Sequence, residues 1–231
     1  MIFCAAHERV WNDETEIRSH RAHDQIEAGI CRLVKPSGFR KHGRTLHRFV
    51  DEDISQVINF QPGQAYLNMT HLMTVNLGIR VPECFERTFS PSAPMKKYCH
   101  EYECNIRSRL GEIDGGEVRV FDLRGDMDAI EAEIVRDVET KVLPVFDALS
   151  SRDAILLHRR DYPHFDTLND HLILLEEAMI YGRRGQKDKA KALFEQYYQG
   201  VFDKYQQDKD AKHLKGHLSY LDGLAGNLGL R

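Results

Sequence analysis

Two arginines separated by one residue, Arg107 and Arg109, are the side chains best spaced to hold an anion. In an extended segment, residues two apart lie on the same face, so the two guanidinium groups would act together. Guanidinium groups bind carboxylates and phosphates through paired hydrogen bonds. The alternative is that both arginines pair with acidic residues of the following helix, which are Glu131, Glu133 and Asp137.

A second group of cations lies upstream, where residues 32–49 carry six lysines or arginines, two histidines and no acidic residue. Such a stretch attracts phosphates, and its phenylalanines offer rings for stacking. Charge runs of this size more often lie on a solvated surface, and strand alternation puts only half of them on one side. The candidate ligand-binding residues are therefore the following: Arg107, Arg109, Gln61, Arg44 and Arg48.

Cysteine and histidine side chains raise the question of a zinc site. Four possible ligands lie in or beside one irregular segment: Cys84, Cys99, His100 and Cys104. They contain no C-x-x-C pair, and adjacent residues rarely bind one ion together. His213 and His217 share a helical face at i, i+4 but lack a third ligand nearby. We expect no metal site and no cofactor.

The overall composition is that of an ordinary globular chain. The 231 residues include 32 basic and 36 acidic side chains, and the net charge of −4 argues against a nucleic-acid partner. No apolar run approaches the roughly 20 residues of a membrane helix. The start lacks the basic region of a signal peptide. Five scattered cysteines, an odd number, predict a reducing compartment and hence a cytoplasmic protein.

Hydrophobic periodicity predicts the elements that position these residues. A helix is expected over about residues 15–33, where a proline and a glycine just beyond it end it. Apolar and polar side chains then alternate over residues 45–50, 54–60 and 66–81. This pattern is typical of an antiparallel meander with one buried face. Residues 82–103 contain three prolines and no periodicity, so a long loop is expected there.

The remainder of the chain is expected to be largely helical. A short element at 104–110 and a fourth strand at 117–123 precede a helix that begins near residue 127 and that Pro144 kinks or ends. Further helices are predicted at residues 152–160, 172–181, 187–205 and 214–221, the last kept short by the glycines beyond it.

The predicted fold class is therefore α+β: an antiparallel β-sheet meander packed on an N-terminal helix, followed by a helical C-terminal region. We expect an α+β domain over residues 1–160. A helical hairpin and tail over 161–231 is expected to pack on the same domain.

Short motifs follow one another along the first two thirds of the chain: Gly38-Phe39-Arg40-Lys41-His42-Gly43, Phe60-Gln61, Asn76-Leu77-Gly78-Ile79 and Cys104-Asn105-Ile106-Arg107-Ser108-Arg109-Leu110-Gly111. Over about residues 15–160 their order and content resemble a bacterial family, domain of unknown function 4304. The resemblance implies a helix packed against an antiparallel sheet. It carries over no activity and no catalytic residue. The chain departs from the family at residues 117–121, where a tryptophan pair is common, since its one tryptophan is Trp11.

The helical pair near the C-terminus resembles one tetratricopeptide unit. Small and aromatic residues recur at the spacing that closes such a hairpin: Ala178, Tyr181, Gly185, Ala190 and Phe194. A solenoid needs about three repeats, so we interpret the single copy as a cap on the domain.

These observations favour a non-enzymatic binding module that acts through a protein partner or a small anionic ligand near Arg107, Arg109 and Gln61. A bacterial immunity or accessory role would suit it. The sequence contains none of the G-x-S-x-G, P-loop, G-x-G-x-x-G or H-E-x-x-H motifs. The alternative is a hydrolase or transferase that acts on a phosphorylated or anionic substrate through the basic run from Arg32 to Arg48.

Overall fold

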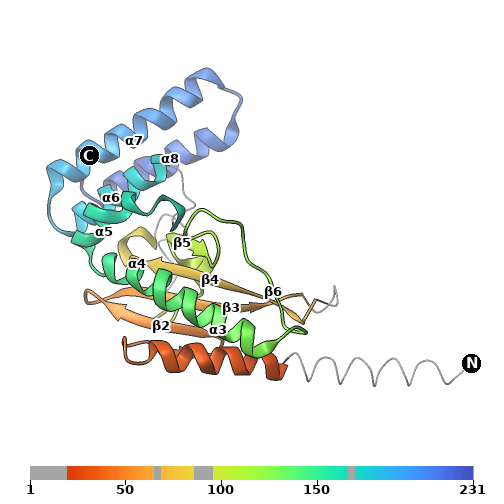
Figure 1. The fold of residues 1–231 in the computed structure, drawn as a ribbon. Coiled ribbons are helices and arrows are strands. Elements are labelled where there is room, and N and C mark those ends of the chain that lie inside the picture. Colours follow the sequence, from red (N-terminus) through yellow and green to blue (C-terminus); the bar gives the residue numbers. More distant parts are fainter. Residues whose placement is uncertain (1–19, 65–68, 86–95, 166–169, 231) are drawn as a thin grey trace, which may run out of the picture. The chain divides into compact units, whose positions relative to one another are not determined.

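The computed structural model describes residues 20–64, 69–85, 96–165 and 170–230 (Figure 1). The chain falls into two compact units. The first draws on Met1–Val81 and Ser92–Thr167, and the second on Pro82–Pro91 and Leu168–Arg231. Among the helices of the described residues, none has both the length and the apolar character that a membrane span requires.

The first unit is built on an antiparallel sheet. In the described residues the strands are, in sheet order, β1 (Arg40–His42), β2 (Thr45–Val50), β3 (Ile54–Pro62), β4 (Leu72–Arg80) and β5 (Ile106–Arg109), and β6 (Phe121–Asp122) also pairs with β4. The predicted α+β class and the meander of three central strands are confirmed. Leu46, Ile58 and Leu77 lie opposite one another across these strands, so their alternation places one apolar face on the core.

Helices cover this apolar face. They are the helix over residues 20–34, α3 (Met127–Asp137) and α4 (Leu143–Ala148), and Figure 1 shows the first two running along the sheet. Ile30 and Ile134 from these helices are fully buried. The residues of the predicted first helix before position 20 lie outside the described residues.

The α-helix that begins at Met127 is interrupted just before Pro144, as the sequence predicts. A π-helix, Val138–Val142, joins α3 to α4, and the proline lies in the first turn of α4. Proline has no N–H, so the first turn, where that donor is not required, tolerates it. The wider π turn lets the chain continue with Val138 and Val142 still buried.

Two strand predictions are corrected in length. The strand expected at 117–123 pairs over Phe121 and Asp122, because β5 already occupies the same edge of β4 from Asn76 to Ile79. The strand expected to begin at residue 66 begins at Leu72, while 65–68 lie outside the described residues.

Short helices complete the first unit. α5 (Arg152–His158) begins at Ser151, whose side chain accepts a hydrogen bond from the Ala154 N–H, as an N-cap does. Single 3₁₀ turns lie at Glu101–Glu103, Arg159–Asp161 and Pro163–Phe165.

The second unit is helical. It contains a 3₁₀ turn (Pro82–Cys84) and the helices α6 (Asp170–Arg183), α7 (Lys187–Gln207) and α8 (Lys212–Asn227). The predicted α6–α7 hairpin is present. The final helix is longer than predicted because Leu218, Leu221, Leu224 and Ala225 bury one face of α8, which outweighs the cost of its glycines.

Arg48 links the apolar face of the sheet to the helices that cover it. Its Nε donates to Oε1 of the buried Gln56 at 2.6 Å, and a terminal nitrogen lies 2.7 Å from Oδ1 of Asp147. The guanidinium also lies over the Phe39 ring, 5.0 Å from its centroid. Arg48 is therefore a structural cation of the core.

We expect Arg48→Met to lower the free energy of unfolding by about 2–4 kcal/mol, because Gln56 would lose a buried charged donor. Arg136→Met is the matched control, since Arg136 is exposed and its ion pair with Asp137 is long, at 3.8 Å. The control should cost about 0.5 kcal/mol or less. Urea denaturation measures both, and equal losses would contradict a structural role for Arg48.

Candidate functional site

The second face of the sheet is polar. Four side chains lie opposite one another across neighbouring strands: Thr45, Asn59, Asn76 and Arg109. Asn59 donates a hydrogen bond to Oγ1 of Thr45 at 2.9 Å, and Asn76 donates to Oδ1 of Asn59 at 3.4 Å. Asn76 also donates to Oε1 of Gln61 at 2.7 Å. A connected polar row therefore crosses the sheet toward Arg109.

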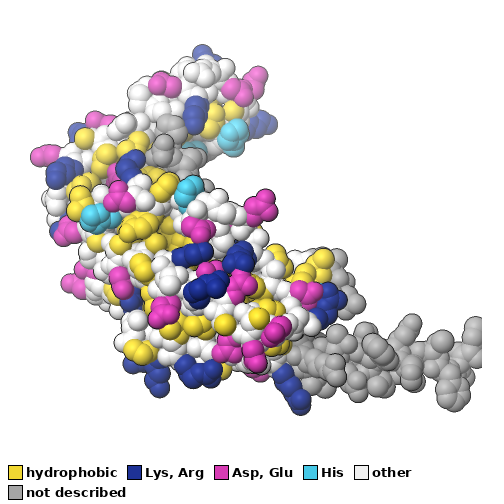
Figure 2. Space-filling model, viewed as in Figure 1, with side chains coloured by type: hydrophobic (Ala, Val, Ile, Leu, Met, Phe, Trp, Pro, Cys, Tyr) yellow, Lys and Arg dark blue, Asp and Glu magenta, His cyan; other side chains and the backbone are white. Residues whose placement is uncertain are grey.

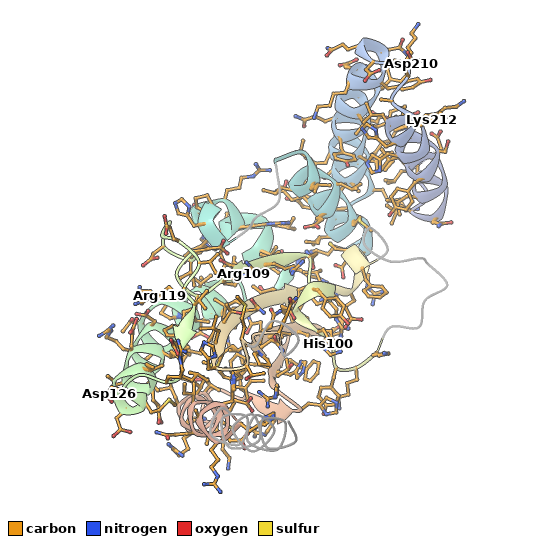
Figure 3. The ribbon with its side chains drawn as sticks, turned by 90° about the vertical axis from the view of Figure 1, so that its right-hand side faces the viewer. His100, Arg109, Arg119, Asp126, Asp210 and Lys212 are labelled. Atoms are coloured by element: carbon orange, nitrogen blue, oxygen red, sulfur yellow. The ribbon has the colours of Figure 1, made fainter. Side chains whose placement is uncertain are left out.

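Arg107 and Arg109 lie on the same side of β5, because the segment is extended and they are two residues apart. They line one pocket of about 180 Å³, which we call the arginine pocket. Figure 3 labels Arg109 on this strand and His100 in the segment that precedes it. The lining residues are Asn76, Glu101, Arg107, Ser108, Arg109 and Glu112.

The charges in the arginine pocket are unevenly paired. A terminal nitrogen of Arg107 lies 3.7 Å from Oε1 of Glu101. Glu112 accepts a hydrogen bond from the backbone N–H of Arg109 at 3.1 Å. Among the described residues, the Arg109 guanidinium makes no hydrogen bond or ion pair. Oδ1 of Asn76 and Nε of Arg107 are buried without a hydrogen-bond partner in the described structure. The pocket therefore offers donors from two guanidinium groups and acceptors from Asn76 and from the carboxylates of Glu101 and Glu112.

Arg109 also borders a second, more apolar pocket of about 270 Å³. Its lining includes Gln61, Pro62, Met69, Leu72, Val118 and Val120. A guanidinium between a polar and an apolar pocket suits a ligand that has an anionic end and a carbon skeleton.

The acidic residues of α3 are paired with other cations. Glu133 and Asp137 form ion pairs with Arg119, and Glu131 lies 3.3 Å from a nitrogen of Arg32. Basic and acidic side chains are interspersed on the face shown in Figure 2. These carboxylates therefore pair with Arg119 and Arg32 and not with Arg107 or Arg109, which line the arginine pocket.

Arg44 and Arg48 lie away from the arginine pocket. Arg48 faces the opposite side of the sheet, where it contacts Gln56 and Asp147. Arg44 pairs with Glu27 of the helix over residues 20–34, at 3.5 Å. Gln61 is joined to the pocket through its hydrogen bond with Asn76.

The segment over residues 96–104, which we call the covering segment, lies across the polar face. Arg80 on β4 donates hydrogen bonds to the carbonyls of Lys96 and Lys97, at 2.9 and 3.0 Å. Cys99 and Cys104 form one buried cluster with Val57 of β3. A Cβ added at Gly78 would lie 2.6 Å from Sγ of Cys104, so the glycine permits this close approach.

The four residues considered for zinc form no common group in the described part of the chain. Cys99 and Cys104 are buried together, whereas His100 is exposed and stacks on Tyr102 with ring centroids 5.0 Å apart. Cys84 belongs to the second unit, where its thiol lies 3.7 Å from the Glu176 carbonyl. The described residues contain no group of three histidine, cysteine or acidic side chains placed to hold a metal ion.

Sequence reasoning missed two residues of this face. Asn76 is placed beside Arg109 by the register between β4 and β5, and His47 lies close enough to Cys99 to lower the pKa of that thiol. Alternation along β2 and β4 gives the side of the sheet on which each residue lies. It does not give the pairing between strands or the loop that covers them.

Most of this site lies in a segment that matches a known protein family. The model of the family described as Domain of unknown function (DUF4304) matches residues 32–148. The chain belongs to this family. The DUF4304 match ends with α4, so it contains the sheet, the arginine pocket and the covering segment, while α5 to α8 lie beyond it. Neither the curated proteins nor the solved structures compared with the chain gave a match.

We expect Gly78→Ala to lower the free energy of unfolding by about 1–3 kcal/mol, because its Cβ would overlap the Cys104 side chain. Cys104→Gly removes that side chain, so the double variant should be more stable than the sum of the two single effects predicts. Denaturation of all four proteins measures this coupling. Strict additivity would contradict the packing of the covering segment on β4.

Proposed function

We propose that this DUF4304 protein is a non-enzymatic binding module that holds a small anionic ligand in the arginine pocket. The ligand carries a carboxylate or phosphate group, which the guanidinium groups of Arg107 and Arg109 bind. The main support is the Arg109 guanidinium, which has no partner among the described residues and lies beside the buried, unpaired Oδ1 of Asn76.

The groups at the site suggest the chemistry of the ligand. Two guanidinium groups donate hydrogen bonds to anionic oxygens, and such charge-assisted bonds are the stronger ones. The Asn76 carbonyl oxygen accepts a hydrogen bond, so the ligand also supplies an O–H or N–H donor. Hydrogen phosphate and hydroxycarboxylates satisfy both requirements. The Arg107–Glu101 ion pair, at 3.7 Å, is long enough for the ligand to compete for Arg107.

The basic-run alternative receives less support. A phosphorylated substrate held between residues 32 and 48 needs free cations on one face, whereas Arg48 is buried against Gln56 and Arg44 is paired with Glu27. We therefore assign the anion to the arginine pocket. Cys31, Cys99 and Cys104 are free thiols, which supports a reducing, cytoplasmic setting.

We expect inorganic phosphate and citrate, titrated separately at fixed ionic strength, to bind the wild-type protein saturably. Arg109→Gln should weaken the tighter of the two by about tenfold or more, since it removes a charge-assisted donor. Isothermal titration calorimetry measures the affinities.

Arg136→Gln is the matched control, because it removes the same charge from an exposed site on α3. Its affinity should equal that of the wild type. The proposal fails if neither anion saturates, or if the two substitutions weaken binding equally, since general charge attraction then explains the result.

A further inference from the structure

Two thiols of the covering segment are in contact. Cys99 and Cys104 are both buried, and together with Val57 they form one cluster. The 3₁₀ turn Glu101–Glu103 lies between them and folds the chain back, with the Cys104 N–H bonded to the Glu101 carbonyl at 3.0 Å. The fold therefore brings together two cysteines that are five residues apart in sequence.

The surroundings of Cys99 stabilise its thiolate. The pKa of Cys99 is lowered to about 5. The largest cause is hydrogen bonding by Cys104, and smaller contributions come from His47, the positive charge of Arg80 and Ser55. The Sγ atom lies 3.7 Å from Oγ of Ser55. Burial, the largest effect, raises the pKa of Cys104 well above its usual value. Cys99 therefore has the character of a reactive thiolate, whereas Cys104 remains a protonated thiol.

His47 is fixed in place to act on Cys99. It is buried on β2, and Tyr98 packs edge-on against its ring with centroids 5.1 Å apart. Phe49 stacks on the same ring at 6.3 Å. This aromatic surround holds the imidazole at the thiol. We regard His47 as a positioning residue, because it acts through Cys99.

A pocket of about 510 Å³ borders the covering segment on the side of Arg80. Arg80 and Lys97 line this pocket. Arg80 stabilises the Cys99 thiolate, and Lys97 lies two residues before Cys99 in the sequence. Cys99 itself retains 3% exposure. An oxidant as small as hydrogen peroxide fits such limited access better than a large disulfide does.

We propose that Cys99 and Cys104 form a reversible dithiol–disulfide pair, in which peroxide oxidises Cys99 first and Cys104 then closes the disulfide. The geometry that carries the proposal is the contact between the two thiols on the polar face. The proposal is independent of the anion in the arginine pocket.

The reaction balances with hydrogen peroxide as the oxidant. The Cys99 thiolate attacks one peroxide oxygen, so an S–O bond forms, the O–O bond breaks and hydroxide leaves. The hydroxide takes the proton of Cys104 and becomes water. The Cys104 sulfur then attacks the Cys99 sulfur, so the S–S bond forms, the S–O bond breaks and a second hydroxide leaves. This hydroxide takes the proton that the Cys99 thiol had released and becomes water. Two thiols lose two electrons, peroxide gains two, and two waters form.

Thiol reductants return the pair to its starting state. Two molecules of a low-molecular-weight thiol exchange with the disulfide, which regenerates both cysteines and leaves one oxidised thiol pair. A reversible disulfide of this kind is compatible with a reducing compartment.

Peptide mass spectrometry tests the pair directly. Cleavage after Lys97 and Arg107 releases residues 98–107, which contain both cysteines. After limiting peroxide and alkylation of the remaining thiols, we expect this peptide to lose two hydrogen atoms and escape alkylation. Dithiothreitol should reverse the change. Cys31, which is partly exposed, is the internal reference thiol and should remain alkylated.

The two cysteine variants assign the order of events. In Cys104→Ser, the Cys99 sulfenic acid should persist and react with dimedone. In Cys99→Ser, Cys104 should form neither a disulfide nor a dimedone-labelled sulfenic acid at the same peroxide dose. The proposal is overturned if Cys31 oxidises before the peptide of residues 98–107 does, or if dimedone labels Cys99 equally with and without Cys104.

The pH profile of Cys99 alkylation by iodoacetamide tests His47. We expect a midpoint near 5 in the wild type, with alkylation slowing as acid protonates the thiolate. His47→Phe keeps a ring of similar shape but removes the donor that lowers the pKa of Cys99, so the midpoint should rise by about one pH unit. The matched control is His100→Phe, the same change at an exposed neighbour of Cys99, which should leave the midpoint unchanged. An unchanged midpoint in His47→Phe would overturn the role of this histidine.

Discussion

Arg80 donates hydrogen bonds from β4 to the carbonyls of Lys96 and Lys97, and this contact holds the covering segment on the polar face of the sheet. The residues that follow depend on that placement. Cys99 and Cys104 meet over Val57, and Glu101, between them, reaches the arginine pocket beside Arg107. The arginine pocket and the Cys99–Cys104 pair therefore both depend on the buried guanidinium of Arg80.

The two faces of the sheet meet different physical demands. The face under the helices buries aliphatic side chains, and its one buried amide, Gln56, is held by Arg48 and by the Phe146 carbonyl. The other face carries amides, a histidine and arginines, some with buried polar atoms that no described residue satisfies. Unpaired buried polar groups cost stability. A fold that retains them at Asn76 and Arg107 places them where a ligand can complete their hydrogen bonds.

The sequence was sufficient to predict the elements formed by local patterns. Alternation predicted β2, β3 and the buried face of β4, and the spacing of Arg107 and Arg109 predicted that they share a side of β5. The interruption predicted at Pro144 is present as a π turn just before the proline, and Val138 and Val142 of that turn remain buried.

Contacts between distant segments were not predictable in this way. The partners of Arg48 and the placement of His47 near Cys99 depend on which loop or helix covers each face. Residue spacing along one strand does not contain that information. The residue types of the cysteines suggest zinc ligands, whereas the turn between Cys99 and Cys104 brings these two thiols into contact with each other.

Hydrogen–deuterium exchange of wild-type protein and of Arg80→Lys tests the account most directly. Lysine keeps the charge of Arg80 but lacks the planar fork that reaches two carbonyls. We predict that the amides of Glu103 and Cys104, which close the 3₁₀ turn, lose protection, while the amides of β2 and β3 keep theirs. Unchanged protection of these two amides would contradict the claim that Arg80 holds the covering segment in place.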